Sequence, residues 1–80
     1  MNIYLLEQDE VMGYDTYDSC VVIAENEERA RCISPNPYAD ESWDTDSWVS
    51  KKDRDKVKVT LLGVSSSDKE RLVISSFNAG

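Results

Sequence analysis

Histidine is absent from this chain of 80 residues, and glycine occurs only three times. Without histidine, a Ser-His-Asp or Cys-His catalytic arrangement is impossible. The three glycines are too scattered to form a phosphate-binding loop, and no Walker motif is present. Carboxylates are plentiful, but acid–base catalysis requires two of them in one cleft with separated pKa values, and a chain this short seldom encloses such a cleft. We therefore expect no enzymatic activity.

Cysteine is also scarce, with only Cys20 and Cys32 present. A structural zinc site requires four ligands, which two cysteines cannot supply without histidine. One pair of cysteines in a cytoplasmic chain is more typical of small hydrophobic core residues than of a disulfide. We therefore expect both thiols to be free and buried.

The acidic run DESWDTDSW, residues 40–48, is rich in the carboxylates that bind calcium in the twelve-residue loop of EF-hands. If the loop begins at Asp40, Thr45 occupies the position that requires glycine, and Lys51 replaces the bidentate glutamate. If it begins at Asp44, the glycine position falls on a valine. Both frames fail, so the run predicts a solvated acidic loop, with no metal and no other cofactor.

Long hydrophobic runs are missing as well, since none approaches the roughly 18 residues that cross a bilayer. The first ten residues, MNIYLLEQDE, are acidic where a secretory signal is basic. A chain of this length builds one small core. We therefore expect a single domain over residues 1–80, a cytoplasmic location and no membrane association.

Basic residues are rare in the first fifty positions. Residues 1–50 carry twelve acidic and two basic side chains, whereas residues 51–80 carry four acidic and seven basic ones. Phosphate contacts need clustered lysine and arginine, so we expect no direct nucleic-acid binding by the acidic part. A basic surface on a protein or ribonucleoprotein complex fits this charge better.

Two strands and a helix are predicted in the first half of the chain. NIYLLEQ (residues 2–8) alternates imperfectly, as in a central strand that is covered on one side and partly on the other, and SCVVIA (residues 19–24) is a β-branched run. The polar stretch between them predicts a long hairpin loop. Asn26 is a candidate helix N-cap, Ala30 faces inward, and Pro35 ends a helix of about two turns.

Two more strands are predicted in the last third. The stretch VKVTLLG points its first, third and fifth side chains inward, namely Val57, Val59 and Leu61. After a serine-rich turn, LVISSF (residues 72–77) is expected to return as the antiparallel partner of that strand.

The middle segment, residues 34–50, holds both prolines and both tryptophans. We expect at least one indole to lie over the core, with Trp48–Val49 entering a short strand and KKDRDK forming a solvated turn after it. The order of elements is then β-β-α-β-β. This order predicts an α+β fold: a small antiparallel or mixed sheet of four to five strands with one short helix packed on one face.

Aromatic residues in acidic surroundings are candidates for partner binding, because tyrosine and tryptophan dominate binding hot spots. The alternative is that their rings close the edges of a small core while the hydroxyl groups reach water. We favour binding for Tyr14 and Tyr17, both in GYDTYDS, and a core position for Trp48. The candidate partner-binding residues are Tyr14, Asp15, Tyr17, Asp18, Asp40, Glu41, Trp43, Asp44 and Asp46.

Five stretches carry a resemblance to a known group of proteins: GYDTYDS at 13–19, VVIAENEERAR at 21–31 followed by Pro35, SWVS at 47–50, VKVTLLG at 57–63 and SSFNAG at 75–80. Over most of its length the chain resembles a family of short proteins found in bacteriophages and prophages. The resemblance implies a phage accessory protein that works in a bacterial host. It implies no reaction and no catalytic residues.

Small acidic α+β proteins of this origin include inhibitors of CRISPR–Cas and other bacterial defence systems. By that analogy, the resemblance implies a non-enzymatic protein that binds and inhibits a host protein or ribonucleoprotein complex through its acidic, tyrosine-containing surface. One alternative is a phage structural or housekeeping protein that forms a homodimer or larger homo-oligomer by pairing its sheet edges. Another is a module that binds a small ligand under a tryptophan lid.

Overall fold

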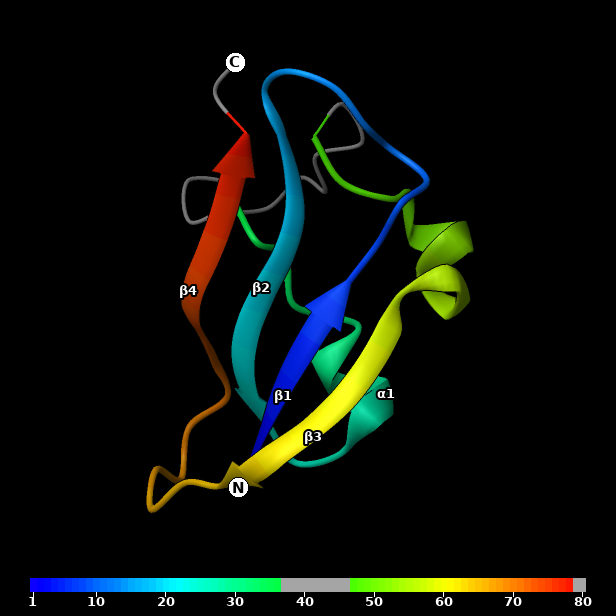
Figure 1. Cartoon of the computed structure of the whole chain (residues 1–80). Coiled ribbons are helices and arrows are strands. Elements are labelled where there is room, and N and C mark those ends of the chain that lie inside the picture. Colours follow the sequence, from blue (N-terminus) through cyan, green and yellow to red (C-terminus); the bar gives the residue numbers. More distant parts are fainter. Residues whose placement is uncertain (37–46, 79–80) are drawn as a thin grey trace.

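The computed structural model describes residues 1–36 and 47–78. Its elements in chain order are β1 (Asn2–Glu7), β2 (Thr16–Ala24), α1 (Glu27–Ala30), the 3-10 helix η1 (Lys51–Lys56), β3 (Lys58–Val64) and β4 (Arg71–Asn78). The strands form one sheet in the order β3-β1-β2-β4, and every neighbouring pair is antiparallel (Figure 1). The predicted α+β class is confirmed, with four strands in the described part of the chain.

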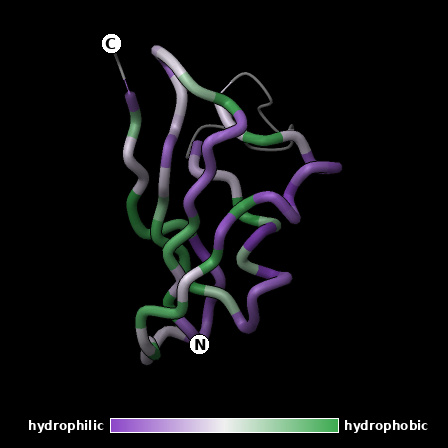
Figure 2. Tube along the Cα trace, turned by 45° about the vertical axis from the view of Figure 1, so that its right-hand side comes forward, coloured by the Kyte–Doolittle hydropathy of each residue, from purple (hydrophilic) through white to green (hydrophobic). Residues whose placement is uncertain are grey.

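The central hairpin of β1 and β2 supplies most of the core. In its register Tyr4 faces Val22 and Leu6 faces Cys20. These four side chains are at most 4% exposed. Successive side chains of a strand point to opposite faces, so these residues define the core side of the sheet. Hydrophobic residues concentrate towards the end of the sheet that holds the N-terminus (Figure 2).

Helix α1 and the segment before η1 cover the core side. Trp48 and Val49 are each 1% exposed, Ala30 is fully buried, and all three belong to the main core cluster. The core position predicted for Trp48 is therefore confirmed. The strand predicted at Trp48–Val49 is wrong, because this segment is a turn followed by irregular chain. A backbone hydrogen bond of 2.8 Å, from the Tyr17 amide to the Ser47 carbonyl, holds it beside β2.

Helix α1 is a single turn rather than the two turns predicted. The N-cap is confirmed, since the Asn26 side-chain oxygen accepts a hydrogen bond of 2.9 Å from the Arg29 amide. Arg29 also pairs with Glu70 at 2.7 Å, and Glu70 accepts a second bond from the Glu25 amide at 3.1 Å. A helix this short has no stability of its own. It is fixed by its cap, by Ala30 in the core and by this tie to the chain before β4.

The predicted pairing of the last two strands is wrong, because β3 and β4 lie on opposite edges of the sheet. The chain between them crosses the end of the sheet at the N-terminus (Figure 1). There the amino group of Met1 donates to the carbonyls of Ser65 and Ser67 at 3.1 and 3.2 Å, and the Ser65 amide donates to the Met1 carbonyl at 2.7 Å. These hydrogen bonds hold the connection between β3 and β4 against the N-terminus, whereas a hairpin would join the two strands by a tight turn.

The edge strand β3 departs from its predicted burial. Val57, just before it, is buried as expected, but Leu61 is 57% exposed. Leu61 is the register partner of Tyr4 and therefore points to the core side. Helix α1 packs on β1 and β2, so it does not reach this corner. The turn predicted before β3 is the 3-10 helix η1, in which Asp53 accepts a hydrogen bond of 3.0 Å from the Ser50 hydroxyl.

Candidate protein-binding loop

Residues 9–15, here called the 9–15 loop, connect β1 to β2 at the end of the sheet opposite the N-terminus (Figure 1). Two large apolar side chains stand out from it: Met12 is 76% exposed and Tyr14 is 77% exposed. Four exposed acidic residues accompany them, three in the loop and one in β2: Asp9, Glu10, Asp15 and Asp18. Apolar side chains ringed by acids are a composition suited to binding a basic protein surface.

The side chain of Gln8 fixes the first half of the 9–15 loop by hydrogen bonds. Its side chain is 9% exposed and makes four hydrogen bonds with loop or strand backbone. The amide nitrogen donates to the carbonyls of Val11 and Tyr17 at 2.8 and 2.7 Å. The amide oxygen accepts from the backbone N–H groups of Glu10 and Val11, both at 2.8 Å. One buried side chain thus uses both its donor and its acceptor capacity to fix the loop.

The second half of the loop is fixed from its other side. Gly13 and Asp15 adopt positive φ angles of 108° and 61°, which glycine and, less readily, aspartate tolerate. The Gly13 carbonyl accepts from the Thr16 hydroxyl at 2.8 Å and from the Asn78 side chain at 2.9 Å. The Asp15 amide also donates to the Asn78 carbonyl. The end of β4 therefore fixes this half of the loop by hydrogen bonds, and Tyr14 projects from an ordered backbone.

The structure corrects the role expected of Tyr17. Strand β2 begins at Thr16, three residues earlier than predicted, so only the first part of GYDTYDS lies in a loop. Tyr17 is 8% exposed, and its ring packs on Phe77 with 4.8 Å between ring centroids. It closes the edge of the core, and the expectation of an exposed binding residue is wrong for Tyr17. Tyr14, Asp15 and Asp18 are exposed, as that expectation requires.

The other candidate binding residues, Asp40, Glu41, Trp43, Asp44 and Asp46, lie outside the described residues. The sequence reasoning missed three residues of the loop region: Met12, Gln8 and Asn78. Gln8 could have been found, because it continues the inward alternation of Tyr4 and Leu6 as a polar residue. Nothing in the sequence indicates that Asn78, 65 positions away, contacts Gly13.

The prediction for the two thiols is confirmed for Cys20 and wrong for the burial of Cys32. Both are free, but only Cys20 is buried, while Cys32 is exposed. Burial raises the pKa of Cys20 to about 12, so this thiol is protonated at neutral pH and is a poor nucleophile. Among residues 1–36 and 47–78, no three histidine, cysteine, aspartate or glutamate side chains are grouped as metal ligands.

Comparisons with known proteins add no assignment. No protein-family model, no curated protein and no solved structure matches this chain. The resemblance to bacteriophage proteins therefore stays a prediction. Within the described residues, no helix is long and apolar enough to pass through a bilayer.

Proposed function

We propose that this protein is not an enzyme, and that it binds a basic surface on another macromolecular complex and blocks that complex. The observation that carries the proposal is the 9–15 loop, where Met12 and Tyr14 are exposed on a backbone that is hydrogen-bonded from both sides. Large side chains held in this way bind at a low entropic cost, because the loop is ordered before the partner arrives.

Each part of the loop has a separate role in the proposed complex. Tyr14 is a rigid anchor with an apolar ring and a polar hydroxyl, and Met12 is a flexible one that adapts to an irregular pocket. The surrounding carboxylates lie at the rim, where charges mainly steer encounter and set specificity. The net charge of −7 reinforces this steering towards basic surfaces.

The target class follows from the resemblance to bacteriophage proteins rather than from the loop itself. A phage accessory protein working in a bacterial host meets defence complexes such as CRISPR–Cas, whose nucleic-acid channels are lined by basic residues. An acidic protein that occupies such a channel competes with the phosphate backbone. We therefore propose inhibition of a bacterial defence complex as the specific form of the function.

The proposal is tested by phage infection of bacteria that carry a defined defence system. Cells expressing the wild-type protein should regain phage plaques, while cells expressing the double variant Tyr14→Ala/Asp18→Lys should not. At position 15 the suitable substitution is Asp15→Asn. It removes the negative charge, and asparagine tolerates the positive φ angle of this position.

The matched control is Glu28→Lys, which changes the net charge by the same two units as Asp18→Lys, at an exposed acid of α1. It should inhibit like the wild type. Equal activity of the loop variant and the control would remove the loop from the account. The test is repeated in a set of strains that each carry one defence system, and if the wild-type protein restores infection in none of them, the proposed target class is wrong.

A further inference from the structure

The face of the sheet opposite α1 is only partly covered by the described residues: Ile23, on this face at the end near the N-terminus, is 4% exposed, but other apolar side chains there are open to solvent. This face, here called the open face, carries the alternate side chains of each strand. Its middle row runs across the sheet through Thr60, Leu5, Val21 and Ile74, which are successive register partners. Ile74 is 65% exposed. A solvated face of an antiparallel sheet is normally polar, so an apolar row here needs an explanation.

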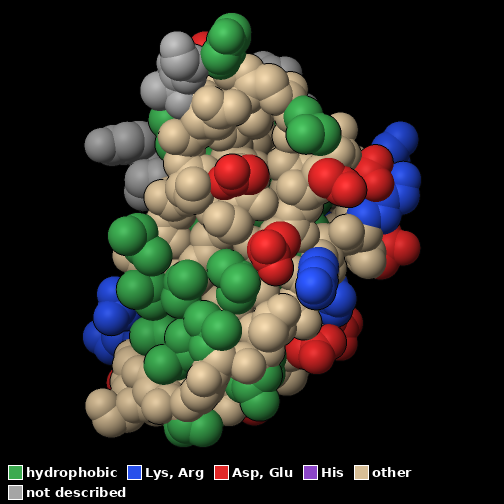
Figure 3. All heavy atoms as spheres, in the orientation of Figure 1, with side chains coloured by type: hydrophobic (Ala, Val, Ile, Leu, Met, Phe, Trp, Pro, Cys, Tyr) green, Lys and Arg blue, Asp and Glu red, His purple; other side chains and the backbone are tan. Residues whose placement is uncertain are grey.

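The apolar side chains of the open face form one patch. The space-filling view shows hydrophobic side chains gathered over the lower half of the sheet, with acidic side chains above them (Figure 3). The two edge strands carry further exposed apolar residues at the points where their register shifts. These are Leu62 in β3, which is 54% exposed, and Val73 in β4, which is 44% exposed. Contiguous patches of this kind on a small domain commonly mark an interaction surface.

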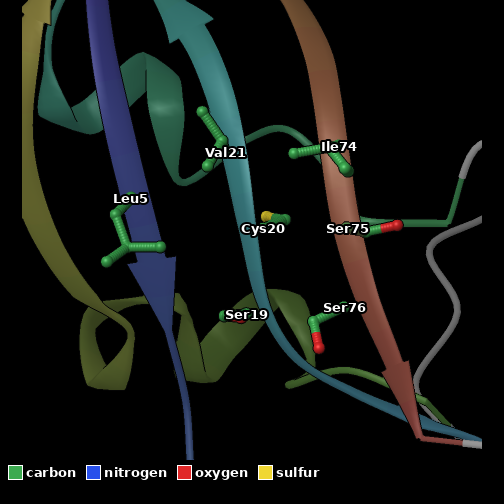
Figure 4. Close-up of a pocket in the computed structure, with 7 residues that line it drawn as sticks. All are labelled: Leu5, Ser19, Cys20, Val21, Ile74, Ser75 and Ser76. Carbon is green, nitrogen blue, oxygen red and sulfur yellow. The ribbon is translucent and has the colours of Figure 1, made fainter.

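A shallow hollow of about 150 Å³ lies within the patch, between β1, β2 and β4 (Figure 4). Leu5, Val21 and Ile74 form its apolar walls, Ser19 and Ser76 lie at one end, and the register partners Cys20 and Ser75 complete the lining. Sites for small ligands usually measure about 300–1,000 Å³. The hollow is therefore suited to a single apolar side chain from an opposing surface rather than to a ligand.

We propose that the open face binds the open face of a second copy of this chain. Charge favours a copy over a basic partner. The charged residues on the open face are Glu7 and Lys58, which are cross-strand partners, Arg71 at the end near the N-terminus, and Asp18 at the register shift of β2, so that two acidic and two basic side chains balance. The face is thus not acidic, although the chain carries a net charge of −7. A basic partner would gain no electrostatic attraction at this face, whereas two near-neutral apolar faces can meet without repulsion.

The arrangement that fits is a two-fold stack in which the strands of the two copies run in opposite directions. Isologous contacts of this kind are the commonest in homodimers, and aligned sheets pack with their faces about 10 Å apart. The acidic ends of the two copies then point away from each other. The two 9–15 loops project from opposite ends of the dimer and stay free for a partner.

The size of the face sets the strength of the contact. Its strands are six to nine residues long. Four strands spaced by about 4.8 Å, with about 3.3 Å per residue, give a face of about 500 Å². Two copies that overlapped over the whole face would bury about 1,000 Å² in total, and overlap of the apolar parts alone buries less, which is below the standard size of specific interfaces and in the range of weak ones. The dimer is therefore weak and depends on protein concentration.

The test is sedimentation velocity of the full chain from about 10 µM to about 1 mM. The wild type should pass from monomer to dimer over this range. Ile74→Lys should weaken association by at least about tenfold, because the substitution occurs twice in a two-fold interface. Raising sodium chloride from about 0.05 to about 0.5 M should not weaken the dimer, since screening reduces repulsion between like-charged copies.

The control is Leu61→Lys, which makes the same charge change at a leucine of similar exposure on the other edge strand and on the core side of the sheet. It should leave association within about twofold of the wild type. Far-ultraviolet circular dichroism of each variant checks that the fold is retained.

Isotope-filtered NMR of a mixed labelled and unlabelled sample should show contacts between Val21 and Ile74 of different copies. A chain that stays monomeric at the highest concentration overturns the proposal. So does a dimer that both lysine variants weaken equally, or one that shows contacts between β4 backbones, because such a dimer pairs through its edges. None of these outcomes bears on the 9–15 loop, so the two proposals fail independently.

Discussion

Replacing Gln8 with methionine should loosen the 9–15 loop while leaving its exposed residues in place. Methionine has a similar length but makes none of the four hydrogen bonds that the Gln8 side chain forms. Each such bond contributes about 1 kcal/mol net, and a carbonyl left unpaired beside the core adds its own cost. We therefore expect the free energy of unfolding to fall by about 2–4 kcal/mol, out of the roughly 5–15 kcal/mol typical of a small domain.

The assay is urea unfolding followed by tryptophan fluorescence, together with amide hydrogen exchange of the loop. The amides of Glu10 and Val11 should exchange faster in the variant, because their acceptor is gone. Met12→Ala is the control in the same loop, and its exposed side chain should change stability by no more than about 0.5 kcal/mol. A Gln8→Met protein with unchanged stability and unchanged exchange at these amides would show that Gln8 does not order the loop.

Three further predictions concern the rest of the fold. Trp48→Ala should cost about 3–5 kcal/mol of unfolding free energy in urea unfolding followed by far-ultraviolet circular dichroism, because removal of a buried indole leaves a cavity. A cost below about 1 kcal/mol would contradict its core position. The pKa of Glu70 is lowered, first by its hydrogen bond with Arg29, so the stability that this carboxylate contributes is present above the usual carboxylate pKa and is lost as pH falls. Glu70→Gln should therefore lower the urea midpoint at neutral pH and match the wild type in acid. An equally lowered midpoint at both pH values would refute this prediction. A thiol reagent should modify only one cysteine in the native protein, and Cys20, with its pKa of about 12, should react only after unfolding.

Much of the fold was predictable because the hydrophobic pattern of each strand is local information. The alternation around Tyr4 and Leu6 predicted a central strand, and Asn26 predicted the start of α1. The neighbour of β4 was not predictable in the same way. A serine-rich connection of six residues suits a hairpin, but it also suits a crossing secured by the N-terminal amino group, and the choice rests on contacts between residues more than 60 positions apart.

The candidate site was predictable only in part. GYDTYDS was predicted to be a polar connection, but only residues 13–15 lie in the loop, and its two tyrosines have opposite environments. Spacing alone does not distinguish Tyr14 from Tyr17, because the start of β2 decides which ring turns inward. Phe77, the ring that packs on Tyr17, comes from the far end of the chain. The exposure of Leu61 likewise follows from the reach of α1 rather than from the pattern of β3.

The central claim is that the 9–15 loop binds a protein and that Tyr14 anchors it. The most direct measurement is quantitative capture from bacterial lysate on immobilised wild-type protein, Tyr14→Ala/Asp18→Lys and Glu28→Lys, with release followed as salt increases. We expect a protein partner that the wild type and the second variant retain, that the loop variant loses, and that dissociates as charges are screened. Equal retention by all three proteins, or capture of nucleic acid in place of protein, would contradict the account.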